Sequence, residues 1–144
     1  MTDWLLLGST SLHGLTVAMR DFALRRVPWW TTASKNGGTI LLSAITVWEI
    51  ALLVDTGRID LDVPVAAWID RFLDRPGIEA VPLSHKAAAC SYQLHHLEHR
   101  DPADRLLIAT AIELACPLIT YDERIVRFCK KHGRQYRFAV DALT

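Results

Sequence analysis

The chain has 144 residues, a length that fits one domain built around a single core. Lys and Arg number 16 and balance the 16 Asp and Glu residues, so no overall basic charge draws the protein onto nucleic acid or an anionic membrane. Charges break the apolar runs before the ~20 residues that a membrane span needs, and the N-terminus lacks a secretion-signal pattern. We therefore expect one cytoplasmic domain, residues 1–144, whose polyanionic partners, if any, are bound locally.

Short apolar runs alternate with helical patterns along the chain. Apolar runs bounded by glycine predict strands, and apolar residues every three or four positions predict helices. In chain order the predicted elements are strands at 4–8 and 39–45, helices from Ser43 to Gly57 and from 64 to 75, a strand at 78–83, a helix at 84–99 capped by Ser84, a helix at 102–114 capped by Asp101, a strand at 116–120, a helix at 123–133 closed by Gly133, and a strand at 136–140.

The predicted strands are continuously apolar, which is typical of strands buried on both faces. Together with the alternation of strands and helices, this favours an α/β fold with a mainly parallel sheet covered by helices on both sides. In such sheets ligands bind beyond the carboxyl ends of the strands. The residues that follow the strands are therefore the first candidates for a functional site.

Three acidic residues are expected at this rim. Asp122 follows the strand at 116–120, while Glu49 and Asp104 lie in the first turns of two helices. Two of them have a structural alternative: Asp104 can complete a capping box with Asp101, and Asp122 can be a turn or N-cap residue. Glu49 is a charge inside the otherwise apolar run "AITVWEIALLV", where it must be paired, solvated or bound to a metal.

Carboxylates that cluster at one rim repel each other. Two like charges about 4 Å apart cost about 4 kcal/mol at an effective dielectric near 20, so such a cluster either takes up protons or holds a cation. Mg²⁺ or Mn²⁺ is the natural cation, because both accept carboxylate oxygens and keep bound water. Such an ion can activate a water and stabilise charge on a phosphate, so the rim suits phosphodiester hydrolysis.

Three stretches resemble motifs of PIN-domain proteins of the VapC toxin type: "LSAITVWEIALLVDTGRIDL", "DPADRLLIATAIEL" and "PLITYDERI". The resemblance covers about Thr39 to Thr144. It implies a three-layer α/β/α sandwich and a Mg²⁺-dependent endoribonuclease, usually homodimeric and inhibited by an antitoxin protein. It also implies that Glu49, Asp104 and Asp122 are catalytic metal ligands, and that Arg105 and Thr120 occupy neighbouring motif positions.

The N-terminal motif departs from the family pattern. The family places its first metal-binding aspartate at the end of the first strand, in a run such as Leu-Leu-Asp-Thr-His. Here the matching run is "LLLGSTSLHG", and Gly8 occupies the position of the aspartate. Asp3 precedes the strand and Asp21 lies well beyond it, so neither is an obvious substitute. We therefore expect weaker metal binding and weak or absent nuclease activity.

The segment after Gly8 shows neither a clear helical stripe nor a suitable place for "VPWWTT". With free third bases, a shifted reading frame over part of it can encode acidic and basic residues that suit the family better. We hypothesise that about residues 9–38 are read out of frame; the alternative is genuine divergence. The nucleotide sequence decides, because a stop codon in the shifted frame, or the lack of an Asp-Thr-His-like string there, excludes the frameshift.

The C-terminal quarter is locally basic. A solvated helix face explains this pattern, and the same residues could also follow a phosphate backbone beside the acidic rim. The residues are Arg124, Arg127, Lys130, Lys131, His132, Arg134 and Arg137.

Three functions remain open. The three carboxylates favour a Mg²⁺-dependent endoribonuclease of the toxin type. Gly8 favours a catalytically inactive relative that still binds antitoxin or RNA. A flap-cutting DNA nuclease shares the acidic rim, although the small size and the lack of an arch insertion count against it. Metal titration separates the first two, and the choice of substrate identifies the third.

Overall fold

A parallel sheet forms the centre of the protein. The structure, a computed structural model, describes residues 4–8, 38–98, 101–120 and 122–142. Five strands pair in the order β3-β2-β1-β4-β5, and every neighbouring pair is parallel. They are β1 (Trp4–Leu7), β2 (Thr39–Ser43), β3 (Ile78–Val81), β4 (Leu118–Thr120) and β5 (Val140–Ala142). The parallel sheet predicted from the apolar strands is confirmed.

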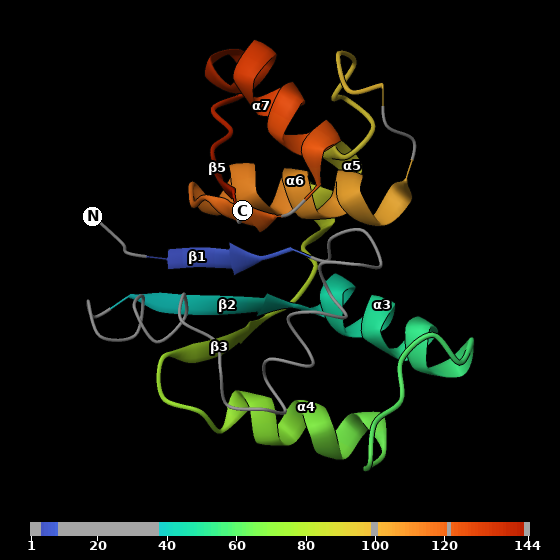
Figure 1. Cartoon of the computed structure of the whole chain (residues 1–144). Helices are drawn as coiled ribbons and strands as arrows, with labels where there is room; N and C mark the ends of the chain where they lie inside the picture. Colours follow the sequence, from blue (N-terminus) through green and yellow to red (C-terminus); the bar gives the residue numbers. More distant parts are fainter. Residues whose placement is uncertain (1–3, 9–37, 99–100, 121, 143–144) are drawn as a thin grey trace.

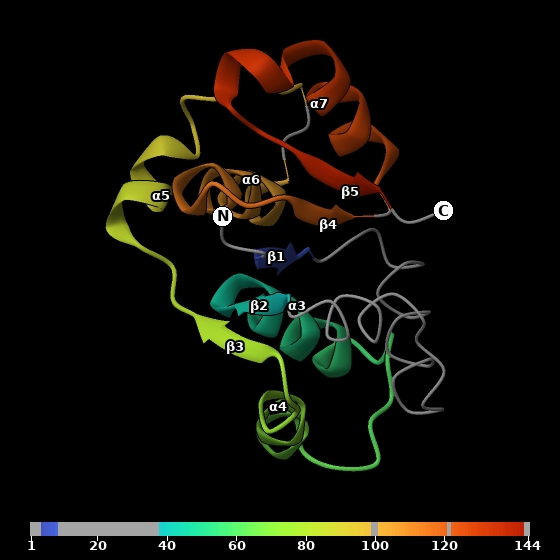
Figure 2. The same ribbon diagram turned by 90° about the vertical axis from the view of Figure 1, so that its left-hand side faces the viewer.

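Helices cover both faces of this sheet. Figure 1 shows β1 and β2 between two helical layers, and Figure 2 shows the same arrangement from the side. One layer holds α3 (Ala44–Asp55) and α4 (Val65–Leu73), and the other holds α5 (His85–Cys90), α6 (Pro102–Leu114) and α7 (Glu123–Tyr136). The three-layer α/β/α sandwich is thus confirmed. Most of the hypothesised frameshift segment, residues 9–37, lies outside the described residues.

Two separate apolar cores hold the layers together. Ile40 and Leu42 of β2 pack with Ile50 of α3 on one face. Leu41, between them in sequence, packs with Leu107 and the rest of the α6 and α7 core on the other face. Successive side chains of a strand point to opposite faces, so one apolar strand supplies both cores. This explains why the strands are continuously apolar in sequence.

The predicted N-caps are confirmed at the start of the helices. The Ser84 hydroxyl accepts a hydrogen bond from the Ala87 amide at 3.0 Å, and Asp101 Oδ1 accepts one from the Ala103 amide at 3.0 Å. Pro102 occupies the first helical position, where its missing N–H costs nothing. These caps fix where α5 and α6 begin.

The helix predicted at 84–99 is much shorter in the structure. α5 ends at Cys90, and turns follow through residue 96. Arg105 explains the change, because its guanidinium donates to the carbonyl oxygens of Ser91 at 3.2 Å and Leu97 at 2.8 Å. The same group lies 5.3 Å from the centre of the Tyr92 ring. Arg105 therefore fixes the loop 91–98 against the first turn of α6.

The end of α7 also differs from the prediction. Gly133 does not close this helix but lies inside it, and Arg137 ends it in the left-handed conformation with φ 55°. The chain then turns back so tightly that a Cβ on Gly133 would lie 2.7 Å from the Phe138 carbonyl oxygen. Gly133 is needed for this close approach, and the last strand begins at Val140 rather than Tyr136.

A helix that spans a membrane must be both long and apolar. Within the described ranges, none of the helices combines the length and the apolar character that a membrane crossing needs.

Candidate active site

The carboxyl ends of three strands lie side by side at one rim of the sheet. Leu7, the last residue of β1, pairs with Leu42 of β2 and with Ile119 of β4. The residues that follow these three therefore lie at the same height at the end of the sheet; they are Gly8, Ser43 and Thr120. Figure 1 shows that α3 and α6 begin on the side toward which the β1 and β2 arrows point. This is the rim where the sequence predicts the acidic site.

Asp122 lies directly beyond β4 and is the N-cap of α7. Its Oδ1 accepts a hydrogen bond from the Arg124 amide at 2.8 Å, and its own amide donates to Thr120 Oγ1 at 3.0 Å. Arg124 Nη2 lies 3.3 Å from Asp122 Oδ2, and only 5% of Asp122 is exposed. The N-cap alternative is therefore confirmed. It is compatible with a metal role, because a carboxylate has about four acceptor positions.

Asp104 is buried in the first turn of α6, with 5% exposed. The N-cap of this helix is Asp101, three residues earlier. A buried carboxylate is costly unless it is compensated, and the positive end of the helix dipole provides part of that compensation. A carboxylate at this depth is therefore a strong candidate for a functional group.

Glu49 is half-buried on α3, and a threonine one turn earlier fixes this helix against the sheet. Thr46 is fully buried, and its hydroxyl donates to the carbonyl oxygen of Leu7 at 2.9 Å. This bond holds the first turn of α3 at the end of β1, beside Gly8. Thr46 was not among the residues predicted from sequence, although it is a polar residue one turn before Glu49 in an otherwise apolar run.

The three carboxylates do not form a closed ligand set. Within residues 4–8, 38–98, 101–120 and 122–142, no three His, Cys, Asp or Glu side chains are grouped so that they could hold a metal ion. Mg²⁺ does not require such a group, because it commonly binds one or two carboxylates and retains several waters. The oxygen donors present here, two of them buried aspartates, are of the chemical type that Mg²⁺ prefers.

Gly8 fills a position where the backbone leaves no room for a side chain. A Cβ added here would lie 2.6 Å from the Ile119 carbonyl oxygen and 3.2 Å from Leu118 Cδ1. The Gly8 amide donates to the same Ile119 oxygen at 3.0 Å. Gly8 therefore lacks a ligand atom and also permits a close approach of β1 to β4. The substitutes considered from the sequence, Asp3 and Asp21, lie outside the described residues.

The protein is an α/β/α sandwich that carries buried aspartates near the carboxyl ends of its parallel strands, so it falls in the class of α/β domains with an acidic site at this rim. The chain belongs to the PIN-domain family, whose pattern matches residues 12–131. It is also 31% identical over 108 residues to Ribonuclease VapC22 from Mycobacterium tuberculosis, a match that covers 67% of this chain and 82% of the relative. The resemblance to PIN domains and to VapC-type ribonucleases is thus confirmed.

Solved structures support the same fold. VapBC2 from Rickettsia felis, crystallised with a DNA fragment from its promoter, is similar with a TM-score of 0.67 at 19% identity, covering 98% of this chain and 99% of that one. FitAcB from Neisseria gonorrhoeae has a TM-score of 0.53 at 20% identity, covering 94% of this chain and 95% of that one. At these identities the matches establish the arrangement of layers.

Proposed function

We propose that the protein is a Mg²⁺-dependent endoribonuclease, the toxin of a toxin–antitoxin pair, and that it hydrolyses RNA phosphodiester bonds. The observation that carries the proposal is the burial of Asp104 and Asp122 at the strand-end rim of a PIN domain. The named ribonuclease among its relatives supports RNA as the substrate. The single domain expected over residues 1–144 remains part of this proposal.

In this proposal Glu49, Asp104 and Asp122 hold one metal ion together, one or two of the carboxylates directly and the rest through waters that the metal retains. When bound, Mg²⁺ or Mn²⁺ would activate water and neutralise charge on the phosphate. Asp104 and Asp122 are kept in place by the first turns of α6 and α7, and Thr46 orients the helix that carries Glu49. Rigid elements of this kind preorganise a site, so little rearrangement is needed when substrate arrives.

Arg124 is placed to contribute to substrate binding. Its guanidinium lies beside Asp122, and 55% of its side chain is exposed. A guanidinium in this position can pair with the Asp122 carboxylate and also present N–H groups to a phosphate. Arg124 would thus connect the metal-binding carboxylate with the RNA backbone.

We further propose that Gly8 makes this nuclease weak. The family's first aspartate is replaced here, so one carboxylate is lost from the metal site. Loss of support for a metal site typically lowers affinity or activity by about 10- to 100-fold. The alternative is a catalytically inactive PIN-domain protein that still binds antitoxin or RNA, and the same glycine is the observation that favours it.

The proposal includes an antitoxin protein as partner, a homodimer as the assembled form and the cytoplasm as location. The structural relatives are described as VapBC and FitAB assemblies, which supports a protein partner. The apolar side chains of Trp48 and Leu52, exposed at 57% and 46% on α3, are available for contact with another chain.

A cleavage assay tests the proposed function. Purified protein is incubated with a labelled single-stranded RNA in Mg²⁺, in Mn²⁺ and in EDTA, and with a flap DNA of matching sequence. We expect slow cleavage of the RNA in either metal and none in EDTA. Cleavage confined to the flap DNA would identify the DNA nuclease instead. Metal-independent cleavage, or no cleavage in Mn²⁺, would contradict the proposed enzyme.

A further inference from the structure

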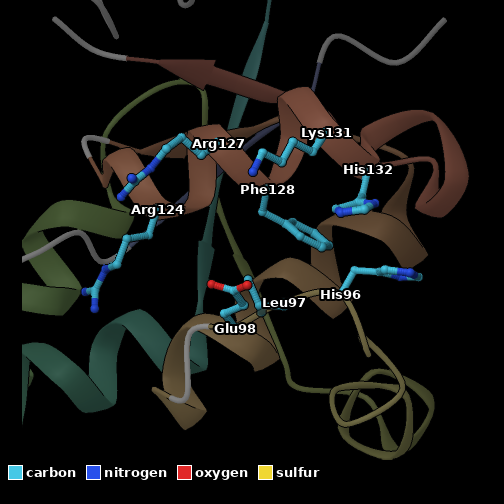
Figure 3. Close-up of a pocket in the computed structure, with 8 residues that line it drawn as sticks. All are labelled: His96, Leu97, Glu98, Arg124, Arg127, Phe128, Lys131 and His132. Carbon is cyan, nitrogen blue, oxygen red and sulfur yellow. The ribbon is translucent and has the colours of Figure 1, made fainter.

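A pocket of about 320 Å³ lies between α7 and the loop 91–98, beside the candidate active site. Figure 3 shows its side chains, with Arg124, Arg127, Lys131 and His132 from α7 on one side and residues of the loop on the other. The volume lies at the lower end of the range for small-molecule sites, so it suits one nucleobase rather than a larger ligand. Arg105 holds the loop wall in place through the Leu97 carbonyl oxygen.

Aromatic rings form one end of this pocket. The His96 and His132 rings are stacked, with centroids 4.4 Å apart and an interplanar angle of 27°. His96 Nδ1 lies 2.6 Å from the Tyr136 hydroxyl, which fixes the imidazole. Phe128 packs beside this histidine pair, and the centre of its ring lies 5.9 Å from the centre of the His132 ring. Unpaired bases of RNA stack on surfaces of this kind.

Cationic side chains line the other end. Arg124, Arg127 and Lys131 follow one face of α7 at spacings of three and four residues, and all three are exposed. From Arg124 to His132 the helix rises by about 12 Å. A single strand lying along this face would therefore pass from the aromatic end of the pocket to Arg124, which contacts Asp122 of the candidate active site.

Glu98 is the one acidic residue among those that line the pocket. Its carboxylate points toward the α7 side chains in Figure 3, and it has no hydrogen-bond or ion-pair partner among the described residues. An acidic group weakens a site meant only for phosphate. It suits a base instead, because an ionised carboxylate accepts two hydrogen bonds side by side.

We infer that this pocket binds one unpaired guanine of the RNA, read by Glu98. Guanine has two adjacent donors, N1–H and N2–H, on its Watson–Crick edge, and these match the two oxygens of a carboxylate. The other bases offer a single donor group there, flanked by acceptors that a carboxylate repels. Stacking on the histidine pair holds the ring, and the α7 cations hold the flanking phosphates. This inference rests on the proposed function, since it takes RNA as the substrate.

Binding measurements in EDTA test the inference without requiring catalysis. The probes are four fluorescein-labelled RNA pentamers, UUGUU, UUAUU, UUCUU and UUUUU, and affinity is measured by fluorescence anisotropy. We expect the full chain to bind UUGUU about tenfold more tightly than the other three, which lies within the discrimination that a bidentate contact to a base provides. Glu98→Gln should remove this preference, because the amide places a donor against one of the guanine donors.

Two variants make the result specific. Glu79→Gln changes an exposed acid on β3, the edge strand at the opposite end of the sheet, and should keep the guanine preference. His132→Ala should weaken all four pentamers by a similar factor, because stacking is tolerant of sequence. Equal affinity for the four RNAs, a preference unchanged in Glu98→Gln, or no binding at all would overturn the inference. The metal-dependent cleavage assay would still decide the proposed function separately.

Discussion

Replacing Asp104 by asparagine is expected to reduce Mg²⁺-dependent RNA cleavage to the level seen in EDTA. Asparagine keeps the size of the side chain and removes the charge that would bind the metal. Removing even an outer partner of a metal ligand can lower activity by up to about 100-fold, so loss of a ligand should cost at least as much. Initial rates on one labelled RNA, measured for both proteins at the same Mg²⁺ concentration, provide the comparison.

Asp101→Asn is the matched control for this experiment. Asp101 lies three residues before Asp104 and caps α6, and asparagine is an equally good N-cap. The control should therefore cleave RNA at nearly the rate of the original chain. If both variants lost activity equally, damage to the helix would explain the loss. If Asp104→Asn kept its activity, Asp104 would not be a metal ligand.

Gly8→Ala is expected to lower the free energy of unfolding by about 1–3 kcal/mol, the usual cost of forcing extra atoms into a packed site. The added Cβ would meet the Ile119 carbonyl oxygen at 2.6 Å, and this oxygen belongs to the backbone of β4. Backbone atoms cannot move aside as a flexible side chain can. Urea unfolding, followed by circular dichroism, measures the change.

The same geometry predicts that Gly8→Asp does not restore a stronger nuclease. An aspartate would supply the carboxylate typical of the family, but it carries the same Cβ into the same carbonyl oxygen. We expect a destabilised protein without faster RNA cleavage. A stable variant with raised activity would show instead that β1 can shift to accept the ligand, and that only the missing aspartate limits the enzyme.

Local signals in the sequence predicted much of the fold. Asp101 followed by Pro102 marks the start of α6 by capping chemistry alone, and the structure begins the helix there. The apolar runs identify β1, β2 and β4, because each side of a central strand must be buried. The parallel topology places Asp122 just beyond β4, at the rim where carboxyl ends of parallel strands meet. The shared metal site of Glu49, Asp104 and Asp122 stays a prediction.

Contacts between distant residues could not be predicted in this way. The pattern at 84–99 favours one long helix, but the Arg105 guanidinium donates a hydrogen bond to the carbonyl oxygen of Ser91, 14 positions earlier in the chain. Gly133 resembles a helix stop, yet it lies inside α7 because Phe138 returns against it. The hydrogen bond from Thr46 to Leu7 spans 39 positions and fixes α3 at the rim. Each of these depends on tertiary packing that a local pattern does not contain.

The pocket beside α7 shows the same division between sequence and structure. The spacing of Arg124, Arg127 and Lys131 already indicates one basic face of a helix. The sequence does not indicate that Glu98 and His96 oppose this face, because they belong to a loop predicted as helix. The basic face alone suggests nonspecific contact with phosphates. With the loop in place, the same face becomes one wall of a pocket that can discriminate between bases.

The central claim is that Glu49, Asp104 and Asp122 share one divalent ion, and calorimetric titration with Mn²⁺ tests it most directly. We predict one ion per chain, with affinity lowered at least about tenfold in each of Glu49→Gln, Asp104→Asn and Asp122→Asn, and unchanged in Glu79→Gln. Absence of a binding signal in the original chain, or variants that all bind Mn²⁺ as tightly as the original chain does, would contradict the shared metal site.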